Sequence, residues 1–167
     1  MTRVGIGFDA HGFDDSRPLI LGGVEIPGMP GLAGHSDADV LSHAVADAIL
    51  GAARLGDLGT MFPDDDAHKG ISSMEILDRT VTALEQTGWS VVNVDATVMA
   101  ERPKLVPYRD DMIGALARAM HVSRDAVWVK ATTTDGMGFT GRAEGVAALA
   151  VVLIDETKDL GGPALSE

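Results

Sequence analysis

Three stretches of the chain carry apolar residues at the three- and four-residue spacing of an amphipathic helix. The first follows Ser36 or Asp37, either of which can cap it, and ends near Gly56. The second covers about residues 72–86 and the third about residues 108–120. We therefore predict three helices, each of which packs one apolar face against a core.

Other stretches are rich in β-branched residues and are bounded by glycine and proline, as is typical of strands. Two short strands are expected around the turn Gly22-Gly23, before a glycine- and proline-rich connection. The remaining expected strands cover residues 3–8, 89–100, 126–134 and 145–155. Helices that alternate with strands, some of them joined as hairpins, indicate an α+β fold: a mixed four-stranded sheet covered by helices on one face.

The last expected strand contains the segment "VAALAVVLI", which is apolar at both odd and even positions. Such a strand is buried on both sides, whereas one layer of helices covers only one side. A homo-oligomer that packs sheet against sheet is the simplest solution. A monomer in which this strand is central is the alternative.

Length and composition predict one domain. The chain has 167 residues, of which 46% are hydrophobic, enough for one core. We assign the domain to residues 1–157, interpret residues 158–167 as a frayed tail, and expect no fused second enzyme.

The net charge of −12 disfavours nucleic acid and anionic membranes as partners. The N-terminus lacks the pattern of a signal peptide, so we expect a cytoplasmic protein.

A metal site can be assembled from three positions. The chain has no cysteine, so its ligands must be His, Asp or Glu. Asp9 and His11 are two residues apart on a strand and share a face. His43 is the best third ligand, with Asp39 or Asp47 four residues away to orient its ring. Such a site keeps an open position, as catalytic zinc does. On pattern alone, a turn-capping Asp9 and two ordinary half-buried histidines are the slightly favoured explanation.

Two further signals indicate phosphate binding. His35 lies just before the first helix, whose N-terminus favours anions, although an exposed capping residue fits equally well. The segment "KATTTDGMGFTGRAEG" combines hydroxyls and glycines with Lys130, Arg142 and Asp135, which could hold Mg²⁺ on a phosphate. Its alternative is a strand that ends in a turn. The acidic segment 62–66 could bind a cation or hydroxyl groups, although a solvated loop is commoner.

Five segments together resemble the 2-C-methyl-D-erythritol 2,4-cyclodiphosphate synthase family of the non-mevalonate isoprenoid pathway. They are "GFDAHGF", "LGGVEIP", "GHSDADVLSHAVADAILGAARLGDLGTMFPDDD", "NVDATVMAERPKL" and "VKATTTDGMGFTGRAEG", in the right order and spacing. The resemblance implies a cyclising phosphorus–oxygen lyase. Its substrate, 4-diphosphocytidyl-2-C-methyl-D-erythritol 2-phosphate, gives the cyclic diphosphate and CMP. It also implies a homotrimer whose active sites lie between subunits.

The resemblance implies a role for each matching residue. Zinc or manganese would be held by Asp9, His11 and His43, while magnesium or manganese on the substrate phosphates would contact Asp135. His35 and Thr133 would stabilise the transition state. The substrate-binding positions would be Asp57, Leu58, Gly59, Phe62, Pro63, Asp64, Asp65, Asp66, Ala100, Lys104, Leu105, Val106, Ala131, Thr132, Thr134, Phe139 and Arg142.

Two points within the resemblance stay open. Asp135 stands where many members have the longer glutamate, so a water-bridged contact to the metal is expected. Phe8 and Arg142 are candidates to line a central trimer cavity that could take an isoprenoid diphosphate.

Two rival functions use the same residues: a zinc phosphoesterase that gives a linear product, and a non-catalytic trimer that only binds isoprenoid diphosphates.

Overall fold

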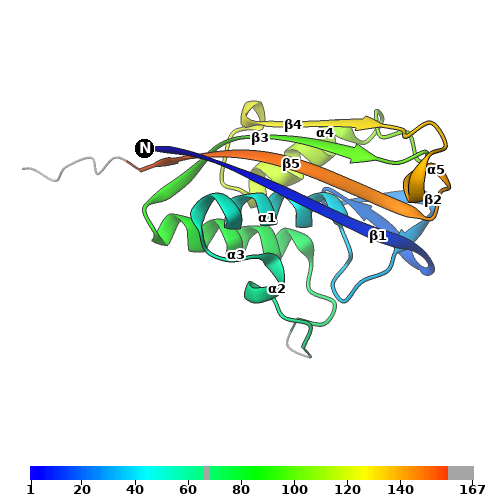
Figure 1. Ribbon diagram of the computed structural model, residues 1–167, viewed down its shortest axis with the longest axis horizontal. Coiled ribbons are helices and arrows are strands. Elements are labelled where there is room, and N and C mark those ends of the chain that lie inside the picture. The colour runs from blue at the N-terminus through cyan, green and yellow to red at the C-terminus, as the bar shows by residue number, and fades with distance from the viewer. Residues whose placement is uncertain (66–67, 158–167) are drawn as a thin grey trace, which may run out of the picture.

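A five-stranded sheet with the strand order β2-β1-β5-β3-β4 forms the centre of the fold (Figure 1). The computed structural model describes residues 1–65 and 68–157. Only β3 and β4 run parallel, and the other neighbours are antiparallel, so the expected mixed sheet is confirmed. The strands are β1 (Thr2–Leu21), β2 (Val24–Leu32), β3 (Trp89–Met99), β4 (Val127–Thr132) and β5 (Gly145–Glu156).

The sheet has five strands and not the predicted four, because β1 continues far beyond the expected segment 3–8 and brings the hairpin strand β2 into the sheet. Its first half pairs with β5, and its second half, from Phe13 onward, pairs with β2. The turn Gly22-Gly23 joins β1 to β2 as expected, with φ values of +56° and +73°. β2 also takes up part of the predicted glycine- and proline-rich connection, because residues up to Leu32 pair with β1.

The three predicted helices are α1 (Val40–Ala53), α3 (Ser73–Gln86) and α4 (Arg109–Ala119). The predicted cap of α1 was wrong: Asp39 caps it and accepts a hydrogen bond from Ser42 N. The buried Asp39 carboxylate also binds the amides of Gly22 and Gly23, and this tertiary contact fixes where the helix begins. Short local patterns missed α2 (Leu58–Met61), α5 (Gly138–Gly141) and the 3₁₀ turn η1 (Arg124–Ala126).

The helices cover one face of the sheet, as expected, and the other face stays exposed in the single chain (Figure 1). Val152 and Ile154 of β5 are fully buried beneath the helices. On the open face, Val4, Ile6 and Phe8 of β1 are 65%, 67% and 56% exposed. β5 is a central strand, yet its Val151 is 41% exposed on this side, so one chain alone does not bury both of its faces.

The segment assigned to a frayed tail, residues 158–167, lies outside the described residues. Within the described residues, no helix has the length and apolar character that crossing a membrane requires.

Candidate metal centre

Strand β1 and helix α1 approach each other unusually closely, and this contact builds the site. Alternate residues of β1 face α1, beginning with Gly5 and Gly7 and continuing to Asp9 and His11. A side chain at Gly7 would place its Cβ only 2.0 Å from the carbonyl oxygen of Ala44, so only glycine fits there. The close packing brings His43, which directly precedes Ala44 in α1, next to the two ligand candidates of β1, Asp9 and His11.

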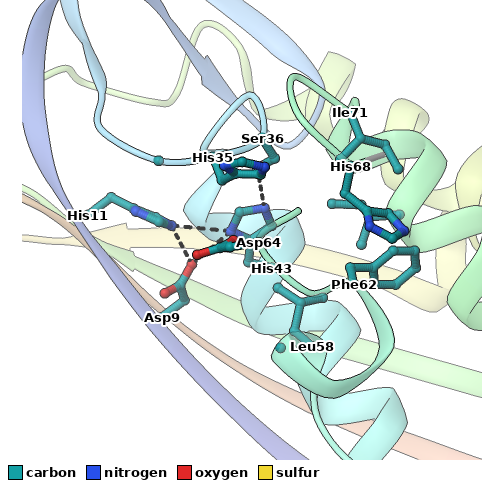
Figure 2. Close-up of a pocket in the computed structure, with 13 residues that line it drawn as sticks. Asp9, His11, His35, Ser36, His43, Leu58, Phe62, Asp64, His68 and Ile71 are labelled. Carbon is teal, nitrogen blue, oxygen red and sulfur yellow. Dashed lines mark hydrogen bonds and ion pairs between the residues drawn. The ribbon is translucent and has the colours of Figure 1, made fainter. Parts of the chain in front are cut away.

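The three predicted ligands lie together (Figure 2). His11 Nε2 is 2.9 Å from Asp9 Oδ2, His43 Nδ1 is 3.0 Å from the same oxygen, and the two ring nitrogens are 3.2 Å apart. Ligand atoms of a tetrahedral site with bonds of about 2.05 Å are about 3.3 Å apart. The donor set and its dimensions therefore fit one divalent ion with an open position, after a shift of a few tenths of an ångström.

Electrostatics in the cluster favour the ionised carboxylate. Burial raises the pKa of Asp9, but hydrogen bonds from His11 and His43 together outweigh it and hold the pKa well below its usual range. Burial lowers the pKa of His11, and the hydrogen bond to Asp9 raises it above the ordinary value. A negative oxygen that faces two imidazole nitrogens is the charge pattern a divalent cation complements.

The outer side of the His43 ring has partners that the sequence did not indicate. Its Nε2 lies 3.1 Å from Ser36 Oγ and 3.0 Å from Ser73 Oγ. The two carboxylates expected to orient the His43 ring have other partners. Asp39 caps α1, and Asp47 accepts a hydrogen bond from the amide of Leu58. Ser73 is 30 residues from His43 along the chain, so no local spacing could have identified it.

A cavity of about 250 Å³ opens beside the metal ligands, and Figure 2 shows the side chains around it. His35 lies on its wall, where its Nε2 is 2.7 Å from the carbonyl oxygen of Asp65. His68 also lines the cavity, packs edge-on against the Phe62 ring and pairs with Asp65 at 2.7 Å. His68 was not among the site residues predicted from the sequence. Predicted substrate positions that line the cavity are Leu58, Gly59, Phe62 and Asp64.

Other predicted positions in this part of the chain lie close by. Asp57 lines an adjoining hollow together with Asp9 and His43, and its carboxylate caps α2 through the amide of Thr60 at 2.8 Å. Pro63 is an exposed residue of the same acidic loop. Asp66 lies outside the described residues.

The threonine-rich loop forms a second, exposed candidate region. Thr133 Oγ1 donates to Asp135 Oδ1 at 3.2 Å, and Asp135 has a φ of +52°, a left-handed conformation. Glu101, at the end of β3, accepts hydrogen bonds from the amides of Thr134 at 3.1 Å and Gly136 at 3.3 Å. Sequence reasoning gave Glu101 no such role. Its carboxylate fixes the turn that presents Thr133 and Asp135.

Part of the predicted substrate-binding set gathers beside this loop. A hollow of about 160 Å³ is lined by Leu105, Val106 and Ala131 of that set, together with Lys130. Ala100 is buried, its amide bonded to the carbonyl of Thr132 at 3.0 Å, and Lys104 is exposed. At the other end of the loop, Phe139 and Arg142 are exposed, and Arg142 pairs with Glu144.

Sheet register separates the two regions within one chain. Ala10 of β1 pairs with Ala147 of β5, which pairs with Met99 of β3, which in turn pairs with Thr132 of β4. Three strand spacings of about 4.8 Å put Asp9 and His11 about 14 Å from the threonine segment. Among the described residues that line the metal-side cavity, none belongs to segments 100–106 or 131–142.

A helix-covered mixed sheet with a carboxylate and imidazole cluster on its helical face defines an α+β protein with a candidate metal centre. The chain belongs to the YgbB family, whose model matches residues 2–155. It is 59% identical over 153 residues to 2-C-methyl-D-erythritol 2,4-cyclodiphosphate synthase of Salinibacter ruber, which covers 91% of this chain and 98% of the relative.

Two solved structures show the same fold. The bifunctional IspDF from Campylobacter jejuni superposes with a TM-score of 0.90 at 43% identity, over 93% of this chain and 42% of that protein. A CDP-bound 2C-methyl-D-erythritol-2,4-cyclodiphosphate synthase superposes with a TM-score of 0.84 at 36% identity, over 92% of this chain and all of the other. The expected family and α+β class are thereby confirmed.

Proposed function

We propose that the protein converts 4-diphosphocytidyl-2-C-methyl-D-erythritol 2-phosphate into 2-C-methyl-D-erythritol 2,4-cyclodiphosphate and CMP. The observation that carries the proposal is the cluster of Asp9, His11 and His43, whose ligand atoms lie within 4.8 Å of one another beside a cavity. The sequence identity to curated synthases over nearly the whole chain indicates which substrate to propose. The reaction makes the protein a cyclising phosphorus–oxygen lyase of isoprenoid biosynthesis.

The reaction is an intramolecular phosphoryl transfer. An oxygen of the substrate's 2-phosphate attacks the β-phosphorus, the bond from that phosphorus to the bridging oxygen breaks, and CMP leaves with the electron pair. The attacking phosphate oxygen is already ionised, so no protein nucleophile or general base is required. The chain's main contribution is to hold both ends of one molecule in line, which removes a large part of the barrier.

The metal-binding residues define the charged end of the site. Zinc or manganese at Asp9, His11 and His43, with magnesium or manganese on the phosphates, supplies positive charge against the two anions and the leaving CMP. His35, on the cavity wall, and Thr133 would hydrogen-bond the phosphoryl oxygens. Asp135 would help to hold the second ion through a water molecule, because its side chain is short and already accepts from Thr133.

The organic parts of the substrate are held by the two remaining groups of positions. The methylerythritol part contacts the acidic loop and the start of α2 beside the metal. The cytidine part would enter the hollow at segment 100–106 and the end of β4. A relative of the same fold binds CDP, which supports a cytidine nucleotide as part of the ligand. The full proposed set is Asp57, Leu58, Gly59, Phe62, Pro63, Asp64, Asp65, Asp66, Ala100, Lys104, Leu105, Val106, Ala131, Thr132, Thr134, Phe139 and Arg142.

The complete site is proposed to lie between two subunits of a homotrimer. A spacing of about 14 Å within one chain exceeds what one diphosphate can bridge, so the metal centre needs the threonine loop of a neighbour. The open face of the sheet supports the assembly, because Val4, Ile6 and Phe8 are exposed there. Phe8, with Arg142, would then border a central cavity that could take an isoprenoid diphosphate.

Phosphorus NMR of the protein with the cytidyl substrate and Mg²⁺ tests the proposal. We expect signals of the cyclic diphosphate and CMP from the native protein and none from His43→Ala. A linear hydrolysis product would instead favour a zinc phosphoesterase. An unchanged substrate that still binds would favour a non-catalytic binding protein.

A further inference from the structure

The imidazole of His43 is held from both sides, and only one side belongs to the metal cluster. On the other side, Nε2 lies 3.1 Å from Ser36 Oγ, the contact drawn in Figure 2, and 3.0 Å from Ser73 Oγ. His43 is 6% exposed, Ser36 8% and Ser73 fully buried. With so little access to water, these two hydroxyls set the hydrogen-bond role of Nε2.

Asp37 determines where the proton of the Ser73 hydroxyl points. Ser73 Oγ donates to Asp37 Oδ1, and the Ser73 amide donates to Asp37 Oδ2 at 2.8 Å. An ionised carboxylate only accepts hydrogen bonds, so the single hydroxyl proton of Ser73 is used there. The Ser73 oxygen can then only accept from His43, which places a proton on Nε2. Nδ1, which faces Asp9 Oδ2 at 3.0 Å, is thereby left as the nitrogen that would bind a metal in place of its hydrogen bond to Asp9.

Ser36 does not decide the tautomer by itself. Its oxygen accepts from the amide of Ala38 at 3.1 Å and lies near the same Nε2. If Ser36 donated to a bare Nε2, the lone pairs of Nε2 and Ser73 Oγ would face each other at 3.0 Å without a proton between them. The pair Ser73 and Asp37 excludes that arrangement.

We propose that Ser73 and Asp37 are positioning residues of the metal centre, acting through the ring of His43. The inference rests on the metal-binding role given above to Asp9, His11 and His43. Ser73 is the first residue of α3, so the packing of α3 against α1 carries the orientation of a ligand. Partners that fix a metal-bound histidine in this way are worth about 10- to 100-fold in metal affinity.

Zinc affinity of the full-length protein, measured by competition with a chromophoric chelator, tests the proposal. Ser73→Ala and Asp37→Asn are expected to weaken zinc binding about 10- to 100-fold, although neither residue is a ligand. Ser72→Ala is the matched control, because Ser72 Oγ caps α3 through the amide of Met74 and has no bond to His43. Its affinity should stay within about twofold of native. Native-like affinity in both test variants would overturn the proposal.

Nitrogen NMR of the histidine rings gives a second readout that needs no activity and no metal. The Nε2 proton of His43 is expected in the native protein with and without zinc, and Ser73→Ala should reduce its protection from exchange. A native His43 without a proton on Nε2 would overturn the proposal even if zinc binds. A native protein that shows this proton but binds no zinc would instead contradict the proposed metal site. Asp37→Asn keeps the shape of the side chain and carries the test if Ser73→Ala does not fold.

Discussion

The metal centre and the threonine-rich loop are built in opposite ways. The metal ligands lie on β1 and α1, with His43 buried and its ring contacted on both sides by polar partners. Thr133 and Asp135 lie in an exposed loop that two hydrogen bonds to Glu101 hold to β3. One chain therefore brings the candidate metal ligands together and leaves the threonine-rich loop exposed. A preorganised ligand set and an exposed loop should respond differently to mutation.

His43→Ala should have the largest effect, because it removes a ligand from the rigid half. Loss of several kcal/mol of charge stabilisation corresponds to a decrease in kcat on the order of 10³-fold or more, together with loss of zinc binding. Steady-state kinetics and zinc titration measure both. His68→Ala is the control: His68 lines the same cavity but is no ligand, and should bind zinc normally. Near-native activity of His43→Ala would show that this metal centre is not needed.

Thr133→Ala should reduce kcat about 10²-fold, the cost of one transition-state hydrogen bond, and leave zinc affinity unchanged. Thr133→Ser keeps the hydroxyl and should recover most of the activity. Comparison of kcat with zinc affinity for the two variants separates the regions. A change in zinc affinity in Thr133→Ala would mean that the two halves are not independent.

Glu101→Ala should release the loop without touching the reacting groups. Two amides lose their acceptor, so the loop must be ordered by the substrate, and we expect KM to rise about 10-fold with a smaller change in kcat. Glu101→Gln retains one acceptor oxygen, so its KM should lie between that of Glu101→Ala and that of the native protein. Unchanged KM values in Glu101→Ala would show that the carboxylate does not hold the loop in solution.

The smallest effect is expected outside both regions, at the exposed His121. Its pKa is raised, first by the hydrogen bond to Asp78 and then by that to Glu85. The charged ring therefore stabilises the folded state below the unfolded pKa of about 6.5. That contribution is lost as the pH rises through the higher folded value.

His121→Asn tests this pH dependence, because asparagine tolerates the φ of +58° at this position. Urea unfolding should give the native protein a higher free energy of unfolding than the variant. The difference should be under about 1 kcal/mol near pH 6 and smaller near pH 8.5. A difference that grew with pH would contradict the assignment. The two active-site regions should give far larger effects on activity than this surface pair gives on stability.

Sequence periodicity located the three long helices and most strands, because each buries a regular apolar stripe. The spacing of Asp9 and His11 also identified two of the three residues of the candidate metal cluster, since residues two apart on a strand share a face. Long-range contacts were missed. Ser73 reaches His43 across the packing of α3 on α1, Glu101 reaches a loop more than thirty residues away, and β1 changes partner along its length. None of these leaves a periodic signal.

Mixed trimers test most directly whether each active site combines the metal centre of one subunit with the threonine loop of another. His43→Ala and Thr133→Ala are each nearly inactive alone, and the two are unfolded and refolded together before activity is measured. Random assembly between subunits should regenerate about a quarter of the sites, each with an intact metal centre and an intact loop. Activity that stayed at the level of the separate variants would show that both halves must come from one chain, and would contradict the account.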